Sequence, residues 1–139
     1  MLANGITLGF RTSQNGSYTN LEGLKEVPEM GLEPEKVENT CLSDSVKQYE
    51  FGIGDAGDLT YKFKYDNSKS TSPYRVMRGY QASKTVLYFC ETLPDGTTYE
   101  YAAQVSVKRS GGAVNGVLEF DLNMALQSEI EVTDPTASV

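Results

Sequence analysis

The sequence contains no histidine and no tryptophan among its 139 residues. Without histidine, the chain lacks the usual general base, the commonest metal ligand and the partner in Ser-His and Cys-His nucleophile pairs. Enzymes built on those pairs are therefore excluded. The aromatic side chains come from nine tyrosines and five phenylalanines, which suit strand faces that are apolar at one end and wet at the other.

Long apolar runs and cysteine are also scarce. No run approaches the roughly 18 apolar residues that span a bilayer, and residues 1–17 lack the charged and apolar regions of a secretory signal. We therefore expect no signal peptide and no membrane anchor. The two cysteines are Cys41 and Cys90. Because the reducing cytosol is the default without a secretory signal, we expect both to be free thiols.

Basic residues are outnumbered, since 12 Lys and Arg stand against 19 Asp and Glu and the formal net charge is −7. A protein that grips nucleic acid needs clustered basic side chains for the phosphates, so this balance argues against that function. A negative wall repels DNA and keeps it from sticking, which remains compatible with a conduit. The length and the 39% hydrophobic content indicate one soluble globular domain.

Apolar and polar residues alternate along most of the chain. In "DLTYKFKY", Leu59, Tyr61 and Phe63 share one face, while Thr60 and Lys62 take the other. A period of two places alternate side chains on opposite faces of a strand, so this stretch is typical of a half-buried antiparallel strand.

The same period recurs in residues 99–108 and 118–124, with Leu118 placed on the inward face. The turn "PDGT" precedes the first of these runs and predicts a hairpin, so we expect a three-strand meander over residues 86–124. The fold class that follows is mainly β, an antiparallel β-sandwich or barrel with one short α-helix. Further short strands are expected within residues 19–27, 35–42 and 128–133.

Residues 72–83 are the segment with helical spacing. Pro73 suits the first helical position and Ser72 the N-cap, while Val76, Met77 and Tyr80 recur at a helical period. We therefore expect a single short helix here.

Residues 52–57 read "GIGDAG", a literal Gly-x-Gly-x-x-Gly, and a Tyr-x-x-x-Lys follows at Tyr80 and Lys84. A dinucleotide fingerprint needs a buried strand before its glycines and a helix after them. Here the preceding residues are polar and a strand follows, so we interpret the glycines as a loop that permits tight turns. Asp55 and Asp58 do not fit the calcium-loop spacing. No catalytic, cofactor-binding or metal residue is predicted.

Four stretches resemble the major tail tube proteins of long-tailed bacteriophages. The "LEGLKEVPEMGLEPEKVENTCLSD" of residues 21–44 is similar to that family's opening, with Pro34, Glu35 and Lys36 in its "P-E-K" motif. It is followed, in the family's order, by "YEFGIGDAGDLTYKFKY", "LPDGTTYEYAAQVSV" and "GGAVNGVLEFDLNMALQSEIE". The resemblance covers residues 18–132.

The resemblance implies a structural protein of the virion tail, made in the host bacterial cytoplasm. It implies six-membered rings of identical subunits, stacked into a hollow tube through which DNA passes without specific binding. Tape-measure and tail terminator proteins are the other implied partners, and no membrane is involved. Within this picture residues 1–17 are expected to form an N-terminal arm, residues 18–132 the β-sandwich core and residues 133–139 a C-terminal tail.

Assembly of such a ring needs surfaces that a neighbouring copy completes, because unpaired strand edges are templates for another chain. A polar, glycine-rich connection at residues 43–57 is long enough to be ordered by a partner. The expected assembly residues of this connection are Tyr49, Phe51, Gly52, Gly54, Asp55 and Gly57. Those of the N-terminal arm are Ile6, Leu8, Phe10 and Arg11. The expected lumen-facing residues are Glu100, Gln104, Glu119 and Asp121.

Two other functions stay open. A monomeric β-sandwich that binds carbohydrate or protein is the second hypothesis, and an enzyme is the third. Binding modules cluster aromatic side chains on exposed loops, whereas most of the tyrosines and phenylalanines here fall on strand faces. That distribution favours assembly. For "GIGDAG" itself, an idle surface loop is the alternative to an assembly device.

Overall fold

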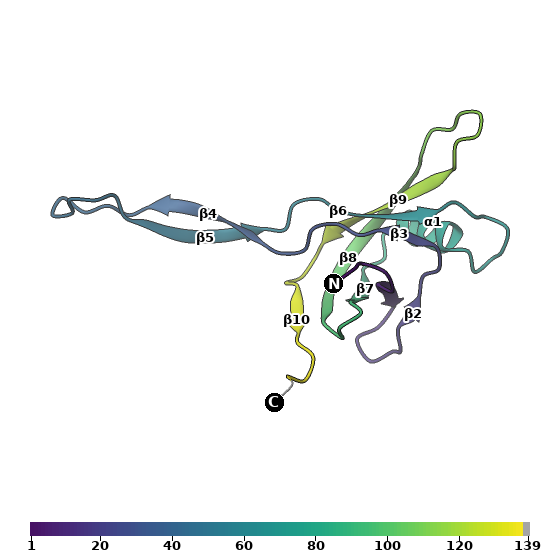
Figure 1. The fold of residues 1–139 in the computed structure, drawn as a ribbon, viewed down its shortest axis with the longest axis horizontal. Coiled ribbons are helices and arrows are strands. Elements are labelled where there is room, and N and C mark those ends of the chain that lie inside the picture. The colour runs from purple at the N-terminus through teal and green to yellow at the C-terminus, as the bar shows by residue number, and fades with distance from the viewer. Residues whose placement is uncertain (138–139) are drawn as a thin grey trace.

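One curled antiparallel sheet forms the body of the molecule within residues 1–137, the part of the chain that the computed structural model describes (Figure 1). Its strand order is β2-β1-β7-β8-β9-β6-β3, and β10 pairs with the start of β8. The strands of this eight-stranded sheet are β1 (Thr7–Arg11), β2 (Thr19–Asn20), β3 (Leu24–Glu26), β6 (Leu59–Lys64), β7 (Leu87–Thr92), β8 (Thr98–Arg109), β9 (Glu119–Leu126) and β10 (Glu131–Thr133).

The predicted meander is confirmed in β7, β8 and β9, which pair antiparallel in sequence order. Gly96 takes a φ of 98° in the turn between the first two strands, where the backbone N–H of Leu93 donates to the carbonyl of Thr97 at 2.9 Å. The positive φ explains the glycine, because other residues are strained there. Leu118 was wrongly expected to face inward, since it precedes β9 and is exposed.

The alternating residues of β6 fill the inside of the curled sheet. Tyr61 and Phe63 are fully buried, and the ring of Phe63 stacks on that of Phe120 of β9 with centroids 5.3 Å apart. Direct cross-strand pairs of this kind are the unit of sheet stabilisation. The period of two in the sequence therefore predicted correctly which side chains of β6 face the core.

The helix α1 (Pro73–Ser83) closes the concave side of the sheet. Met77 is fully buried there, and the ring of Tyr74 meets that of Phe120 edge-on at 5.4 Å. The helix and its first-turn proline are confirmed. Ser72 occupies the N-cap position without a side-chain cap, because its Oγ instead accepts a hydrogen bond from the backbone N–H of Lys69 at 3.1 Å.

The sheet is therefore a half-barrel wrapped around one helix, with β2 and β3 at the ends of its main strand order. The mainly β, antiparallel fold class with one short helix is confirmed. A half-barrel keeps backbone N–H and C=O groups at its outer strands without sheet partners, because the main strand order does not close on itself.

A second sheet stands apart from the body. It consists of β4 (Glu33–Glu38) and β5 (Tyr49–Asp55), an antiparallel pair that projects as a long hairpin (Figure 1). Residues 43–57 were expected to be a connection without structure of its own, and this expectation was wrong for β5. The glycines of the segment concealed its strand character, because glycine weakens the local strand signal.

The N-terminal residues also differ from expectation. Residues 7–11 form β1, which pairs along its whole length with β7, and Leu8 is fully buried in the core. The expectation of a free arm over residues 1–17 is therefore wrong for residues 7–11, which form a strand of the sheet. Burial of Leu8 and the ladder with β7 hold the strand in the sheet. Of the expected C-terminal tail, residue 133 ends β10, and residues 138–139 lie outside the described part.

Candidate functional site

The projecting hairpin exposes large apolar side chains to solvent. Tyr49, Phe51 and Ile53 of β5 have exposed fractions of 56%, 71% and 90%. Tyr49 and Phe51 share one face of the strand, while Ile53 lies where the ladder with β4 shifts register, between Phe51 and Gly54. These three exposed side chains are here called the β5 stripe. No residue of the body covers these side chains, so they add no buried apolar surface to the folded monomer.

The two glycines between these residues explain the "GIGDAG" motif. A Cβ on Gly54 would lie 2.8 Å from the Cβ of Leu32, and a Cβ on Gly52 would lie 3.3 Å from the Cγ2 of Val37. The side chain of Leu32 therefore lies against Gly54, and that of Val37 lies against Gly52. The motif is a packing device of a hairpin, in which glycine lets another group approach closely.

Hydrogen bonds within the tip order the end of the hairpin. The backbone N–H of Gln48 donates to the Oγ1 of Thr40 at 3.0 Å, and that of Cys41 donates to the carboxylate of Asp44 at 2.8 Å. Leu42 is fully exposed beside them. The tip thus presents two apolar side chains, Leu42 and Val46, on an internally bonded turn.

The base of the hairpin is a tight turn into the body. Asp55 accepts a hydrogen bond from the backbone N–H of Gly57 at 2.9 Å, and Gly57 takes a φ of 70°. Such Asx turns are common where Asp precedes a bend. No group of three or more His, Cys, Asp or Glu within residues 1–137 is arranged to hold a metal ion. The Asp and glycine therefore have a local backbone role at this position.

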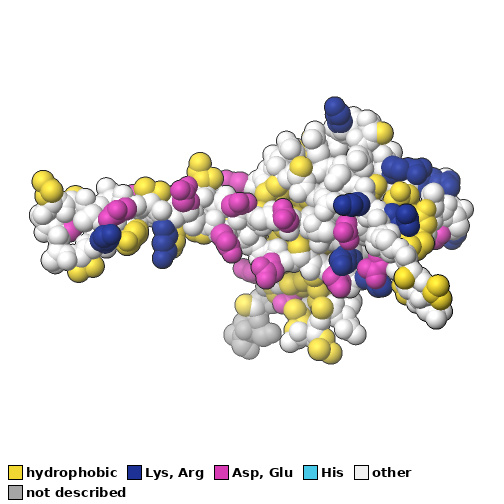
Figure 2. Space-filling view, turned by 90° about the horizontal axis from the view of Figure 1, so that it is seen from above, with side chains coloured by type: hydrophobic (Ala, Val, Ile, Leu, Met, Phe, Trp, Pro, Cys, Tyr) yellow, Lys and Arg dark blue, Asp and Glu magenta, His cyan; other side chains and the backbone are white. Residues whose placement is uncertain are grey.

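Negative charge gathers on the hairpin. Residues 29–58 contain eight of the 19 acidic side chains and two of the 12 basic ones. This segment therefore holds a formal charge of −6 out of the total of −7. Figure 2 shows acidic side chains along the hairpin and at its junction with the body, while Lys and Arg gather at the opposite end.

The N-terminal candidates lie in the sheet rather than on an arm. Leu8 belongs to the core, and Phe10 packs beside it with its ring 6.1 Å from that of Tyr80 on α1. Arg11 lies over the ring of Tyr18 at 4.2 Å and donates from Nη1 to the carbonyl of Gly16 at 2.9 Å. Ile6 lies just before the strand and is half-buried. These contacts give Leu8, Phe10 and Arg11 a role in packing within the monomer.

The lumen candidates lie on β8 and β9, between inward residues, so they take the convex face of the sheet. Asp121 stands opposite Lys62 on one side and Lys108 on the other. Glu119 stands opposite Lys64. The convex face of these strands therefore carries alternating charges rather than a uniformly negative surface.

Glu119 is also held by Lys25 of the neighbouring segment. The Nζ of Lys25 lies 2.6 Å from Oε1 of Glu119, and the resulting hydrogen bond lowers the pKa of this carboxyl below its ordinary value. Glu100 stands opposite Cys90, and the side chain of Gln104 donates to the carbonyl of Lys84 at 3.3 Å. The structure therefore separates the four candidates along the face and does not gather them into one site.

A buried polar cluster escaped the sequence reasoning. Glu91 of β7 is only 2% exposed, and its Oε1 has no hydrogen-bond partner among the described residues. Burial raises the pKa of Glu91, while the neighbouring hydroxyl of Tyr61 partly offsets the effect. The hydroxyl of Tyr101 donates to that of Tyr61 at 2.9 Å. The signal was present in "LYFCE", where Glu91 follows Leu87 and Phe89 on the inward face.

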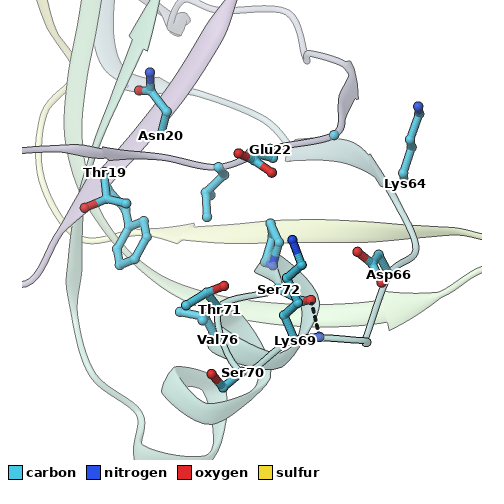
Figure 3. Close-up of a pocket in the computed structure, with 14 residues that line it drawn as sticks. Thr19, Asn20, Glu22, Lys64, Asp66, Lys69, Ser70, Thr71, Ser72 and Val76 are labelled. Atoms are coloured by element: carbon cyan, nitrogen blue, oxygen red, sulfur yellow. Dashed lines mark hydrogen bonds between the residues drawn. The ribbon is translucent and has the colours of Figure 1, made fainter.

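A cleft of about 620 Å³ opens between the segment after β2 and the loop before α1 (Figure 3). Leu21 and Val76 contribute apolar lining, and Lys64 and Lys69 contribute positive charge. The polar groups around it are threonine, serine and asparagine side chains with Glu22 and Asp66. No nucleophile and base are paired among these lining residues.

The dinucleotide hypothesis is rejected on geometry. Gly52 and Gly54 lie in β5, and the next element is β6 rather than a helix. Tyr80 packs in α1, while Lys84 is the left-handed C-cap of the same helix, with a φ of 55°. A pyrophosphate would find no helix N-terminus behind these glycines.

Among the helices of residues 1–137, none has the length and apolar composition to cross a membrane.

Comparison with known proteins points in one direction. Residues 7–134 match the family model described as phage tail tube protein. A search among curated proteins found no match.

Solved structures share the fold. A chain in the six-fold symmetrised baseplate of the anti-feeding prophage has a TM-score of 0.73 at 12% identity, over 96% of this chain and 95% of that one. A chain in the tail of an empty gene transfer agent particle, refined with C6 symmetry, has a TM-score of 0.70 at 19% identity, over 94% and 98%. A chain of the native gene transfer agent virion has a TM-score of 0.67 at 18% identity, over 91% and 95%.

Proposed function

This chain belongs to the phage tail tube protein family, and from that premise we propose that it assembles with copies of itself into stacked six-membered rings that form a hollow tube. The family makes it a structural component of the virion tail. The six-fold symmetry named for the baseplate and tail structures of the same fold supports the ring number. DNA passing through the tube during delivery is the role that follows.

The observation that carries the proposal is the hairpin. It projects from the body, its β5 stripe is exposed, and no strand of the body pairs with it. An isolated two-stranded hairpin is marginal in water, and a stripe of large apolar side chains is a liability for a monomer. Both features become useful when a neighbouring ring covers the hairpin.

Ring closure follows from the half-barrel. Its outer strands retain unpaired backbone groups, and joining them to a neighbour satisfies those groups while ending lateral growth when six copies close. Stacking then remains the open direction. The lumen candidates Glu100, Gln104, Glu119 and Asp121 lie on the convex face, where paired charges leave few free cations to trap phosphates. Tape-measure and tail terminator proteins complete the proposed partners.

Negative-stain electron microscopy of the concentrated, purified protein tests this function. Tubes or rings with a hollow centre are expected, and sedimentation velocity should show species far above the 15.2 kDa monomer. A chain that stays monomeric at every concentration tried, in the presence and absence of a tail extract, would favour the alternative of a monomeric binding module. The family and the absence of a nucleophile–base pair in the described cleft both weigh against an enzyme.

A further inference from the structure

The end of the body opposite the hairpin carries an excess of positive charge. The helix α1 and the loop before it lie at this end (Figure 1). Residues 64–84, which include both, contain five basic side chains and one acidic side chain. Their formal charge of +4 faces away from a hairpin segment of −6. The molecule is therefore charged oppositely at its two ends (Figure 2).

The basic side chains of this end are positioned but uncompensated. The guanidinium of Arg75 donates to the side-chain and backbone oxygens of Asn67 at 2.9 and 2.8 Å, and that of Arg78 lies 5.4 Å from the ring centroid of Tyr74. Within residues 1–137 the ion pairs are Lys25–Glu119 and Lys47–Glu38, so neither arginine has a carboxylate partner there. Lys64 and Lys69 line the cleft and likewise make no ion pair within residues 1–137.

The acidic side chains of the hairpin are open in the same way. All residues of β4 are exposed, and the carboxylates of Glu33 and Glu35 make no hydrogen bond or ion pair among the described residues. Glu38 has the distant Lys47 Nζ at 4.0 Å. Both surfaces therefore keep charges that a partner can neutralise.

We propose that the hairpin of one copy docks, by charge, on residues 64–84 of the next copy along the stack. This inference rests on the proposed function and names the partner face of the hairpin. The contact is heterologous, since one end of the molecule meets the other end of its neighbour, and such contacts extend without limit unless they close. Two hairpin ends repel each other, so every ring stacks in the same direction.

The shape of the basic end suits the docked hairpin. The cleft lined by Leu21 and Val76 opens there, and the hairpin tip presents the fully exposed Leu42. Charge steers and orients the encounter, while burial of the β5 stripe and of Leu42 provides apolar contact. Stacking is then weakened by salt, because the screening length falls from about 8 Å at 0.15 M to about 3 Å at 1 M.

Two complementary variants test the pairing without relying on either one alone. Lys69→Glu with Arg78→Glu lowers the formal charge of residues 64–84 from +4 to 0 and places negative charge at positions 69 and 78. Glu33→Lys with Glu35→Lys lowers the hairpin charge from −6 to −2 and places positive charge at positions 33 and 35. When each variant is tested alone, the amount of pelleted tube is expected to fall about tenfold relative to the unchanged chain, because like charges then meet at the substituted positions. Mixed in equal amounts, the two variants are expected to recover tubes, since positions 33 and 35 of each hairpin then meet opposite charges at positions 69 and 78 of the other variant.

Lys36→Glu with Lys47→Glu is the matched control. It changes the net charge by the same amount as Lys69→Glu with Arg78→Glu, but it makes the hairpin more acidic. Tubes are therefore expected to persist, and to tolerate more salt. Far-ultraviolet circular dichroism and thermal unfolding of every variant confirm that the body is folded.

The outcomes separate the two proposals. An unchanged chain that forms no tubes overturns the proposed function and this inference with it. Tubes from the unchanged chain together with undiminished tubes from both charge-reversed variants overturn this inference alone. Folded variants that fail singly and also fail when mixed place the docking surface elsewhere and overturn it as well.

Discussion

The body sheet and the projecting hairpin are both antiparallel, yet they are held by different forces. In the body, β6 alternates buried and half-buried residues around a core of Tyr61, Phe63 and Phe120. In the hairpin, no residue of β4 or β5 is buried. The same backbone pairing therefore occurs in two settings. The body buries apolar surface as it folds, and the hairpin leaves apolar surface exposed.

Charge separates the two regions as clearly as burial does. The hairpin segment of residues 29–58 holds a formal charge of −6, while the rest of the chain holds −1. Surface charges distant from one another contribute little to folding, because solvent and salt screen them. The concentration of charge on the hairpin therefore contributes little to the stability of the fold.

Two deletions should break this comparison most strongly. Removing residues 1–11 deletes β1, exposes the edge of β7 and removes Leu8 from the core, so we expect loss of cooperative folding. Replacing residues 33–55 with a short Gly-Ser linker removes only exposed strands, so we expect the body to fold and the tubes to vanish. Circular dichroism with thermal melting, followed by microscopy, checks both. Tubes from the linker variant would contradict the role of the hairpin.

A pair of single substitutions sharpens the same contrast. Phe63→Ala removes a fully buried ring and is expected to lower the free energy of unfolding by about 3–5 kcal/mol. Phe51→Ala removes an exposed ring and is expected to change that free energy by less than about 0.5 kcal/mol while impairing tube formation. Urea unfolding measures the first quantity and pelleting the second. A large loss of stability in Phe51→Ala would show that the stripe packs within the monomer.

The buried carboxyl of the body gives a pH-dependent prediction. Burial raises the pKa of Glu91 above its ordinary value of 4.5, so the folded state favours the neutral form. The resulting stabilisation is present below pH 4.5 and is lost as the pH rises through the raised value. Tyr61 and Tyr101 are the titratable groups facing it, and burial raises the pKa of both further above 10.

Glu91→Gln removes this titration. We expect the variant to be more stable than the unchanged chain by about 1–3 kcal/mol at neutral pH, with a flatter dependence of stability on pH above the ordinary pKa of 4.5. Glu131→Gln, an equal charge change at an exposed position, is the control and should preserve the slope. Identical slopes in the Glu91→Gln and unchanged proteins would rule out Glu91 as its source.

The smallest effect is expected at glycines, where the two regions again differ. Gly79 lies within α1 with nothing within 4 Å of an added Cβ, so Gly79→Ala should stabilise the body by about 0.5–1 kcal/mol. Gly54→Ala instead places its Cβ against Leu32 and should loosen the hairpin alone. Amide hydrogen exchange would show faster exchange in β5 and unchanged exchange in β8. Unchanged exchange in β5 would contradict the close packing at Gly54.

Much of the body could be predicted from local pattern. The alternation in β6, the turn at Gly96 and the helical spacing of Met77 each arise within a few residues. The candidate site was predicted less completely. Tyr49, Phe51, Gly52, Gly54, Asp55 and Gly57 were expected to lie on one assembly segment, which remains a prediction, but their strand and its partner β4 were not foreseen in full.

The misses share a physical cause. Residues 7–11 read as an irregular arm because their partner, β7, lies some eighty residues away, and long-range pairing leaves no local signature. The strand over residues 49–55 was hidden by glycines whose reason is the cross-strand side chains of Leu32 and Val37. Glu91 shared the inward period, but only the packed core shows that one of its oxygens is left without a partner.

By itself the sequence determined the strand period, the single helix, the acidic balance and the family, because these are encoded in neighbouring residues and in recurring motifs. Only the tertiary structure decided that the sheet curls into a half-barrel, that β1 joins it, and that β4 and β5 leave the body with their apolar stripe uncovered. Those features depend on which strand edges far apart in the sequence pair with one another and on which strand faces become buried. A local sequence pattern specifies neither.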